Sequence, residues 1–192
     1  MQGQSERFNS SDADVIFRSS DNVLFRLHKQ NLECTTGGFP PANTPSHPDD
    51  IVSLSESAKV LETLFTAAYP LPFPSMRDLD FDSLLELADA AEKYQVFSII
   101  QACRREFYDL TLDKGLHTNT ADLKSKRIKL LQLAIKHSDT EFMDILPRLL
   151  LRARPLEVVN IMPEQMYKQW TLERENEMVA QNRLAMMNFY AK

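Results

Sequence analysis

Asp14 and His28 are the residues of this chain that come nearest to a hydrolytic site, in which a carboxylate orients an imidazole base. The third member of such a site is missing, because the sequence has no Gly-x-Ser-x-Gly turn that would present a serine nucleophile. Polar residues of these types also occur where side chains stabilise the junction between two elements. We therefore expect a stabilising cluster at these positions and no enzymatic activity.

The other histidines do not indicate a metal site. His47 lies in a proline-rich stretch, His117 lies between helical segments, and His137 lies at the end of a predicted helix, where a cation is favourable. None of them belongs to a recognised ligand spacing. The one adjacent glycine pair, Gly37-Gly38, leads into prolines, whereas a phosphate-binding loop leads into a helix. We predict neither a metal nor any other cofactor.

The composition restricts the classes of partner that the protein is expected to bind and its expected location in the cell. A net charge of −5 argues against a general nucleic-acid binder, which needs a basic surface. The first twelve residues are polar and do not resemble a signal peptide, and no stretch approaches the roughly 18 apolar residues of a membrane span. Cys34 and Cys103 can pair or remain free thiols, and a reducing compartment favours free thiols. We expect an intracellular protein, in the cytoplasm or the nucleus and away from membranes.

A basic cluster in the second half of the chain has three interpretations. Its members are Lys124, Lys126, Arg127, Lys129 and Lys136, followed by Arg148, Arg152 and Arg154. A solvated helix face is favoured over nucleic-acid binding, because no aromatic residues for base stacking lie among them. Docking of an acidic protein is the intermediate interpretation, with Lys126 and Arg127 as its candidate residues.

The terminal segment is rich in methionine and contains Trp170, the one tryptophan of the chain. Methionine-rich faces suit adaptable protein contacts, which makes Trp170 a candidate interaction residue. The alternative is that these side chains cover the preceding helices, and this alternative is favoured. The residues concerned are Met162, Met166, Trp170, Met178, Met186, Met187 and Phe189.

The elements that position these side chains are predicted to be strands first and helices afterwards. Residues 15–17 and 23–27 are short apolar runs, the second alternating with period two, and the polar residues between them favour a turn. A hairpin follows, then a short helix from His28, a proline-rich loop over residues 39–50 and a third strand from Ile51. Strands followed by helices indicate an α+β fold with a small three-stranded sheet.

The domain organisation follows from the same pattern. Residues 1–12 read as a disordered lead, residues 13–112 as a domain with the sheet and its packed helices, and residues 113–192 as an all-helical extension. Pro147 lies inside one of the predicted helices, and we expect a kink or a break there.

Several short stretches in this order resemble the BTB/POZ family. Asp14-Val15 opens the first strand, Phe25-x-Leu27-His28-Lys29-x-x-Leu32 leads from hairpin to helix, and residues 87–94, LADAAEKY, are similar to the family's Leu-Ala-Asp-x-Tyr helix. The resemblance covers about residues 12–112. Gly-Gly-Phe-Pro-Pro at residues 37–41 and the helical extension further resemble BTB proteins of fungi.

The resemblance implies a protein–protein interaction module that works without chemistry of its own. It also implies that Asp14 and a basic residue after His28, here Lys29, form a charged pocket at the edge of the hairpin. An adaptor for a cullin ubiquitin ligase is the alternative function, although residues 69–80, YPLPFPSMRDLD, lack the hydrophobic-x-Glu motif of cullin-binding members. The expected binding surfaces are the exposed strand edge near Asp14 and Lys29, the loop over residues 37–50 and the basic helical face. The identity of the protein partner, homo-oligomer formation and cullin binding all stay open at this point.

Overall fold

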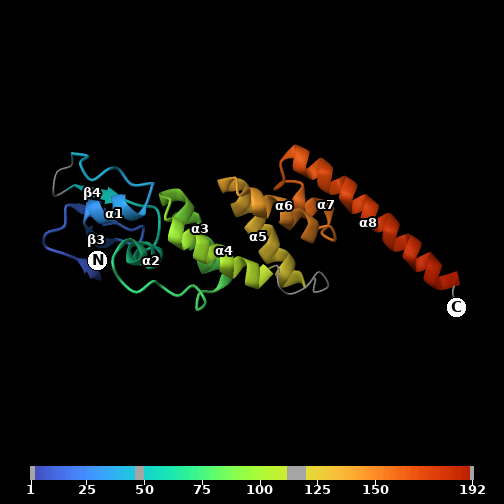
Figure 1. Ribbon diagram of the computed structural model, residues 1–192, viewed down its shortest axis with the longest axis horizontal. Coiled ribbons are helices and arrows are strands. Elements are labelled where there is room, and N and C mark those ends of the chain that lie inside the picture. Colours follow the sequence, from blue (N-terminus) through green and yellow to red (C-terminus); the bar gives the residue numbers. More distant parts are fainter. Residues whose placement is uncertain (1–2, 46–49, 112–119, 191–192) are drawn as a thin grey trace. The chain divides into compact units, whose positions relative to one another are not determined.

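A computed structural model describes residues 3–45, 50–111 and 120–190, with the side chains of residues 185 and 188–190 left out. The chain divides into two compact units, Met1–Tyr108 and Asp109–Lys192. The α+β class is confirmed, with a mixed sheet and packed helices in the first unit and helices in the second (Figure 1). The domain boundary predicted at residues 112/113 lies outside the described residues, as do His47 and His117.

The sheet of the first unit has the strand order β1-β3-β2-β4. β2 and β3 form the predicted antiparallel hairpin, with Phe17 opposite Phe25, and its turn includes Asn22 at a φ of 64°. β1 pairs in parallel with β3, and β4 pairs in parallel with β2. The strands are β1 (Gly3–Asn9), β2 (Val15–Arg18), β3 (Val23–Leu27) and β4 (Ile51–Ser53).

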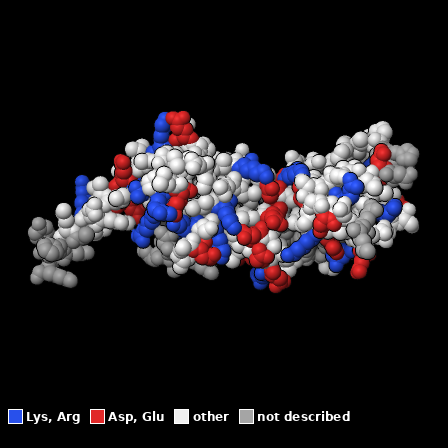
Figure 2. Space-filling view, turned by 180° about the vertical axis from the view of Figure 1, so that it is seen from behind, with Lys and Arg blue, Asp and Glu red and all other residues white. Residues whose placement is uncertain are grey.

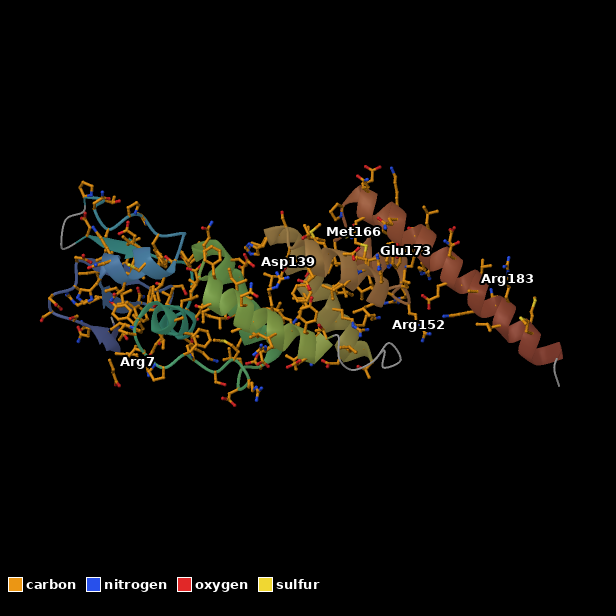
Figure 3. The ribbon with its side chains drawn as sticks, viewed as in Figure 1. Arg7, Asp139, Arg152, Met166, Glu173 and Arg183 are labelled. Atoms are coloured by element: carbon orange, nitrogen blue, oxygen red, sulfur yellow. The ribbon has the colours of Figure 1, made fainter. Side chains whose placement is uncertain are left out.

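The predicted disordered lead over residues 1–12 is wrong, because residues 3–9 form strand β1, and the sheet has four strands where three were predicted. Phe8 is buried and its ring contacts Phe25 and Tyr69. Arg7, labelled in Figure 3, donates from Nη1 to Thr66 Oγ1 at 3.1 Å. The average polarity of this segment suggests disorder. The burial of Phe8 and the backbone hydrogen bonds to β3 nevertheless hold the strand in place.

The helices of the first unit pack their apolar faces on the sheet and on one another. Phe65 lies at the centre of this core and contacts the rings of Phe8, Phe17 and Phe25. Asp80 caps the N-terminus of one of the helices, because its Oδ1 accepts from Ser83 N at 2.9 Å. The helices are α1 (Lys29–Thr35), α2 (Ala58–Ala68), α3 (Phe81–Tyr94) and α4 (Phe97–Thr111), and α4 continues into the second unit.

The second unit contains three further helices and one helical turn among the described residues. They are α5 (Ala121–His137), α6 (Thr140–Leu149), α7 (Pro155–Val158) and α8 (Glu164–Tyr190). Thr120 and Asp139 cap α5 and α6 through their side-chain oxygens. Pro147 lies in the last turn of α6, so the helix ends two residues after it.

A buried arginine joins three helices within the second unit. Arg127 on α5 is 2 % exposed, and its Nε and Nη2 donate to the carbonyl oxygen of Thr111 at 3.1 and 3.0 Å. Its Nη1 donates to the carbonyl oxygen of Leu149 at 3.4 Å. The Leu149 carbonyl belongs to the last residue of α6, where intrahelical donors are no longer present. Thr111 is the last described residue of α4. Arg127 therefore joins α4 and α6 to α5 from inside the core.

Arg127→Met should lower the free energy of unfolding by about 2–4 kcal/mol, because two backbone carbonyls lose a charged donor while they stay buried. The measurement is urea unfolding followed by circular dichroism. Lys126→Met is the matched control, since Lys126 lies on the surface and pairs with Asp122, and its loss should cost at most about 0.5 kcal/mol. Equal effects of the two substitutions would contradict a structural role for Arg127.

Candidate functional site

Asp14 and Lys29 meet where the hairpin passes into α1. Asp14 Oδ1 accepts from the backbone N of Lys29 at 2.7 Å, and the Asp14 backbone N donates to the carbonyl oxygen of Leu27 at 3.1 Å. Lys29 Nζ donates to the carbonyl oxygen of Thr44 at 2.9 Å, which ties the loop after α1 to the same junction. The carboxylate of Asp14 thus serves the first turn of α1, where a backbone N–H lacks an intrahelical acceptor.

His28 makes its carboxylate contact with Asp12, so the predicted association of His28 with Asp14 is replaced by a different one. Its Nε2 lies 3.3 Å from Asp12 Oδ1, and its Nδ1 lies 3.1 Å from Tyr69 Oη. The Tyr69 hydroxyl also accepts from the backbone N of His28 at 2.8 Å. A hydrogen bond from Ser10, then one from the backbone of Asp12 itself and then the contact with His28 lower the pKa of Asp12. His28 therefore links the β1–β2 connection to the end of α2.

A cavity of about 280 Å³ lies beside this junction, between β2, β4, α1 and the loop that follows α1. Its walls are largely apolar, and Lys29, Thr44 and Asp50 supply the charged and polar groups. The lining residues are Val15, Phe17, Lys29, Leu32, Gly38, Phe39, Pro40, Thr44, Asp50, Val52, Leu54 and Tyr94. We define these residues as the β4 cavity.

The Gly-Gly-Phe stretch forms one wall of the β4 cavity by lying against the end of α3. The backbone N of Gly38 donates to the carbonyl oxygen of Tyr94 at 3.0 Å, and the ring of Phe39 stacks on the Tyr94 ring at 4.7 Å. A Cβ atom on Gly38 would lie 2.6 Å from Tyr94 Cα, which is closer than two non-bonded carbon atoms approach. Glycine is required at position 38 because the two backbones touch there.

Tyr94 is in turn held by Glu56, which follows β4 in the chain. Tyr94 Oη donates to Glu56 Oε2 at 2.6 Å, and Lys93 Nζ donates to Glu56 Oε1 at 2.8 Å. Burial raises the pKa of Glu56, but hydrogen bonds from Lys93, Tyr94 and Ser55 outweigh burial and lower it on balance. Burial and then the Glu56 carboxylate raise the pKa of Tyr94 to about 12. The charged Glu56 carboxylate is therefore a fixed part of this wall.

The edge strands of the sheet in the described part of the chain are β1 and β4, and the sequence predicted an exposed strand edge near Asp14 and Lys29. β2, which follows Asp14, lies between β3 and β4 and is covered on both edges. β4 is the last strand on its side of the sheet, and its apolar side chains Ile51 and Val52 are 43 % and 45 % exposed. β4 borders the same cavity as Lys29, so an edge strand lies near the predicted location.

Three predicted interaction residues lie in the second unit, and two of them are not surface residues. Arg127 is 2 % exposed and Trp170 is 1 % exposed. The burial of Trp170 agrees with the favoured alternative, in which the terminal side chains cover the preceding helices. The burial of Arg127 leaves little of it accessible to an acidic partner, because helical periodicity turns it into the core. Lys126 is on the surface and pairs with Asp122 Oδ2 at 2.8 Å.

The basic cluster does not form one uninterrupted cationic face. Lys124 pairs with Glu157 at 2.7 Å, and Arg148 pairs with Asp144 at 3.2 Å. Figure 2 shows lysine and arginine side chains interspersed with acidic ones over the face that it presents. The pairing favours the interpretation as a solvated surface.

The terminal segment combines both interpretations offered for it. Met162 and Trp170 are buried, and the ring of Trp170 stacks on Tyr167 at 5.7 Å. Farther along α8, apolar side chains such as Met178 and Met186 are exposed, and the Arg183 side chain extends from the same stretch (Figure 3). The side chain of Phe189 lies outside the described ones.

Sequence reasoning missed Val52, Tyr94 and Glu56 as members of the candidate site, whereas Phe39 lies in the loop over residues 37–50, which was an expected binding surface. Phe39 and Tyr94 stand in the two stretches that carry the family resemblance, so a signal for them was present. Val52 stands in a strand of three residues, too short for its alternation to show which face is open. For Glu56 the sequence offers no signal, because its partners are 37 and 38 residues away.

No family model matches this chain, and no curated protein matches it. None of the helices in the described part of the chain is long and apolar enough to cross a membrane. Within residues 3–45, 50–111 and 120–190, no three His, Cys, Asp or Glu side chains are grouped to hold a metal ion. The functional argument therefore rests on the geometry around the β4 cavity.

Glu56→Gln should destabilise the protein by about 1–2 kcal/mol at pH 7, because the charge-assisted bonds from Lys93 and Tyr94 weaken. A carboxyl whose pKa is lowered on folding stabilises the folded state above its unfolded pKa, and this stabilisation is lost as the pH falls through its folded pKa. The difference between wild type and variant should thus shrink as the pH falls below about 4.5, the ordinary value for glutamate. Urea unfolding between pH 7 and pH 3 measures it.

Glu86→Gln on the exposed side of α3 is the control for this measurement, and it should leave the unfolding free energy unchanged at both ends of the pH range. A difference between wild type and Glu56→Gln that stays constant with pH would show that the Glu56 charge does not stabilise this wall.

Proposed function

We propose that this chain is a non-enzymatic protein–protein interaction module of the BTB/POZ type, with its binding surface on the N-terminal unit. The observation that carries the proposal is the apolar β4 cavity beside β4, an edge strand of the sheet in the described part of the chain. An edge strand presents unpaired N–H and C=O groups to another polypeptide, and an adjoining apolar cavity provides a place for one of its side chains.

The order of elements supports the family part of the proposal. The hairpin β2–β3 leads directly into α1, and Asp14 and Lys29 lie in contact at that junction. Two of the stretches that carry the resemblance, Gly-Gly-Phe-Pro-Pro and the helix ending in Tyr94, pack against each other. These two stretches are distant in sequence, both resemble the same family, and they form one local structure.

The lining of the cavity supports binding of an apolar group. Small-molecule sites usually enclose about 300–1,000 Å³ and combine an apolar lining with several converging polar groups. The β4 cavity, at about 280 Å³, is close to the lower end of this range, and most of its wall is aliphatic or aromatic. An apolar side chain of a partner matches this lining better than a charged metabolite does.

The double variant Asp14→Asn with Lys29→Gln should weaken capture of protein partners by about tenfold while the fold survives. Both residues lie at the surface junction beside the cavity, and asparagine can still accept from the backbone of residue 29. The measurement is affinity purification with tagged full-length chain, followed by rebinding of each recovered protein in purified form. Unchanged affinities for the purified partners, with an unchanged circular dichroism spectrum, would remove this junction from the binding surface.

A direct binding measurement against a purified cullin N-terminal domain separates the adaptor function from the general module. We expect no complex at tens of micromolar, which corresponds to an affinity weaker than about −6 kcal/mol. The reason is the stretch at residues 69–80, which lacks the hydrophobic-x-Glu motif. A stoichiometric complex at micromolar concentration would instead establish the adaptor function.

A further inference from the structure

We propose that β4 accepts an added strand from a partner polypeptide whose side chains alternate between apolar and acidic. The apolar side chain occupies the β4 cavity, and an acidic neighbour on the other face of the strand pairs with Arg18. This inference rests on the proposed function, and it specifies the class of partner segment that the module binds.

The backbone of β4 is oriented for such an addition. The N–H of Leu54 donates to the carbonyl oxygen of Arg18 at 2.8 Å, so residues 52 and 54 direct their backbone groups toward β2. Successive residues of a strand point in opposite directions, which turns the N–H and C=O groups of Ile51 and Ser53 away from β2. The sheet ends at β4, so these groups face the side on which a further strand would pair.

The two faces of β4 differ in chemistry. Val52 lines the β4 cavity together with Val15 and Phe17 of β2, and its side chain is 45 % exposed. Directly paired residues of neighbouring strands place their side chains on the same face. A residue paired with Val52 would therefore project into the apolar cavity, where a charged side chain would lose its hydration without compensation.

Arg18 supplies the charge on the opposite face. It neighbours Phe17, which faces the cavity, and its Nη2 donates to Ser53 Oγ at 2.7 Å. Within the described part of the chain, no carboxylate lies at ion-pair distance from its guanidinium. Residues of an added strand that flank the apolar one would point toward this face, and opposite charges in such positions stabilise a strand pair. An acidic residue beside the apolar one thus complements β4.

Peptide selection tests the inference with synthetic ligands and does not require an identified partner. A displayed library of random eight-residue peptides is selected on the full-length chain, and the enriched peptides are synthesised and titrated. We expect an apolar residue with Asp or Glu directly beside it, and no proline at the paired positions. Enriched peptides without this alternation, or no enriched peptides from a chain that binds its purified protein partners, would overturn the inference.

Matched variants of β4 then locate the binding. Val52→Gln should weaken peptide binding at least tenfold, whereas Ile51→Gln, at an equally exposed position on the other face, should change it less than threefold. Ser53→Pro removes an outward N–H and should also cost at least tenfold, while Ser53→Ala keeps that N–H and should not. Arg18→Gln should weaken binding of the acidic peptides about threefold to fivefold.

The outcomes separate this inference from the proposed function. If the wild-type chain binds no purified protein partner, the proposed function fails. If it binds a partner and Val52→Gln binds that partner equally well, only the inference about β4 fails. If sedimentation at several concentrations shows dimers that Val52→Gln abolishes, the occupant is a second copy of this chain, and the acidic partner segment is wrong. Circular dichroism of each variant distinguishes lost binding from lost folding.

Discussion

The close approach of Gly38 to the backbone of Tyr94 is the contact on which the candidate site depends. It brings the loop after α1 against the end of α3, and the stacked rings of Phe39 and Tyr94 then form one wall of the β4 cavity. Tyr94 also donates to Glu56, and the carbonyl oxygen of Glu56 accepts from Ser20 N at 2.9 Å. One steric constraint on a glycine therefore connects the loop, α3 and the segment after β4.

The polar groups at this site are bound to other parts of the fold. Asp14 accepts from the first turn of α1, His28 joins Asp12 to Tyr69, and Glu56 is neutralised by Lys93. Each of these groups forms hydrogen bonds or ion pairs that hold neighbouring segments of the fold together. What they leave open is an apolar cavity and a short strand edge, two features that suit recognition of another chain.

A strand edge that stays uncovered is a risk for aggregation, and the protein limits this risk by its dimensions. β4 has three residues, so it offers few backbone groups to an unspecific strand. Specific pairing with so short an edge needs an additional anchor, and the adjoining cavity can supply it. Length and cavity together favour a selective partner over general self-association.

The sequence by itself determined the order and type of most elements. Period-two alternation in Val23–Leu27 identified a strand, and the apolar faces of α3 and α5 identified helices, because these periodicities are local properties of the chain. The same approach did not identify strand β1 within residues 1–12. This strand is held by backbone pairing with β3 and by burial of Phe8, and the average polarity of the segment reveals neither. The burial of Arg127 was not apparent from the sequence for a similar reason, because its carbonyl partners belong to two other helices.

The tertiary structure alone decided where the candidate site lies. Val52, Phe39 and Tyr94 come from a strand, a loop and a helix that are far apart in sequence, and they form one cavity only after β4 pairs with β2 and Gly38 packs on α3. The sequence set Asp14 beside the hairpin, but strand order decided that β4 is an edge strand of the sheet. Local periodicity depends on neighbouring residues, whereas a cavity and a sheet edge depend on contacts between distant segments, and only folding brings those together.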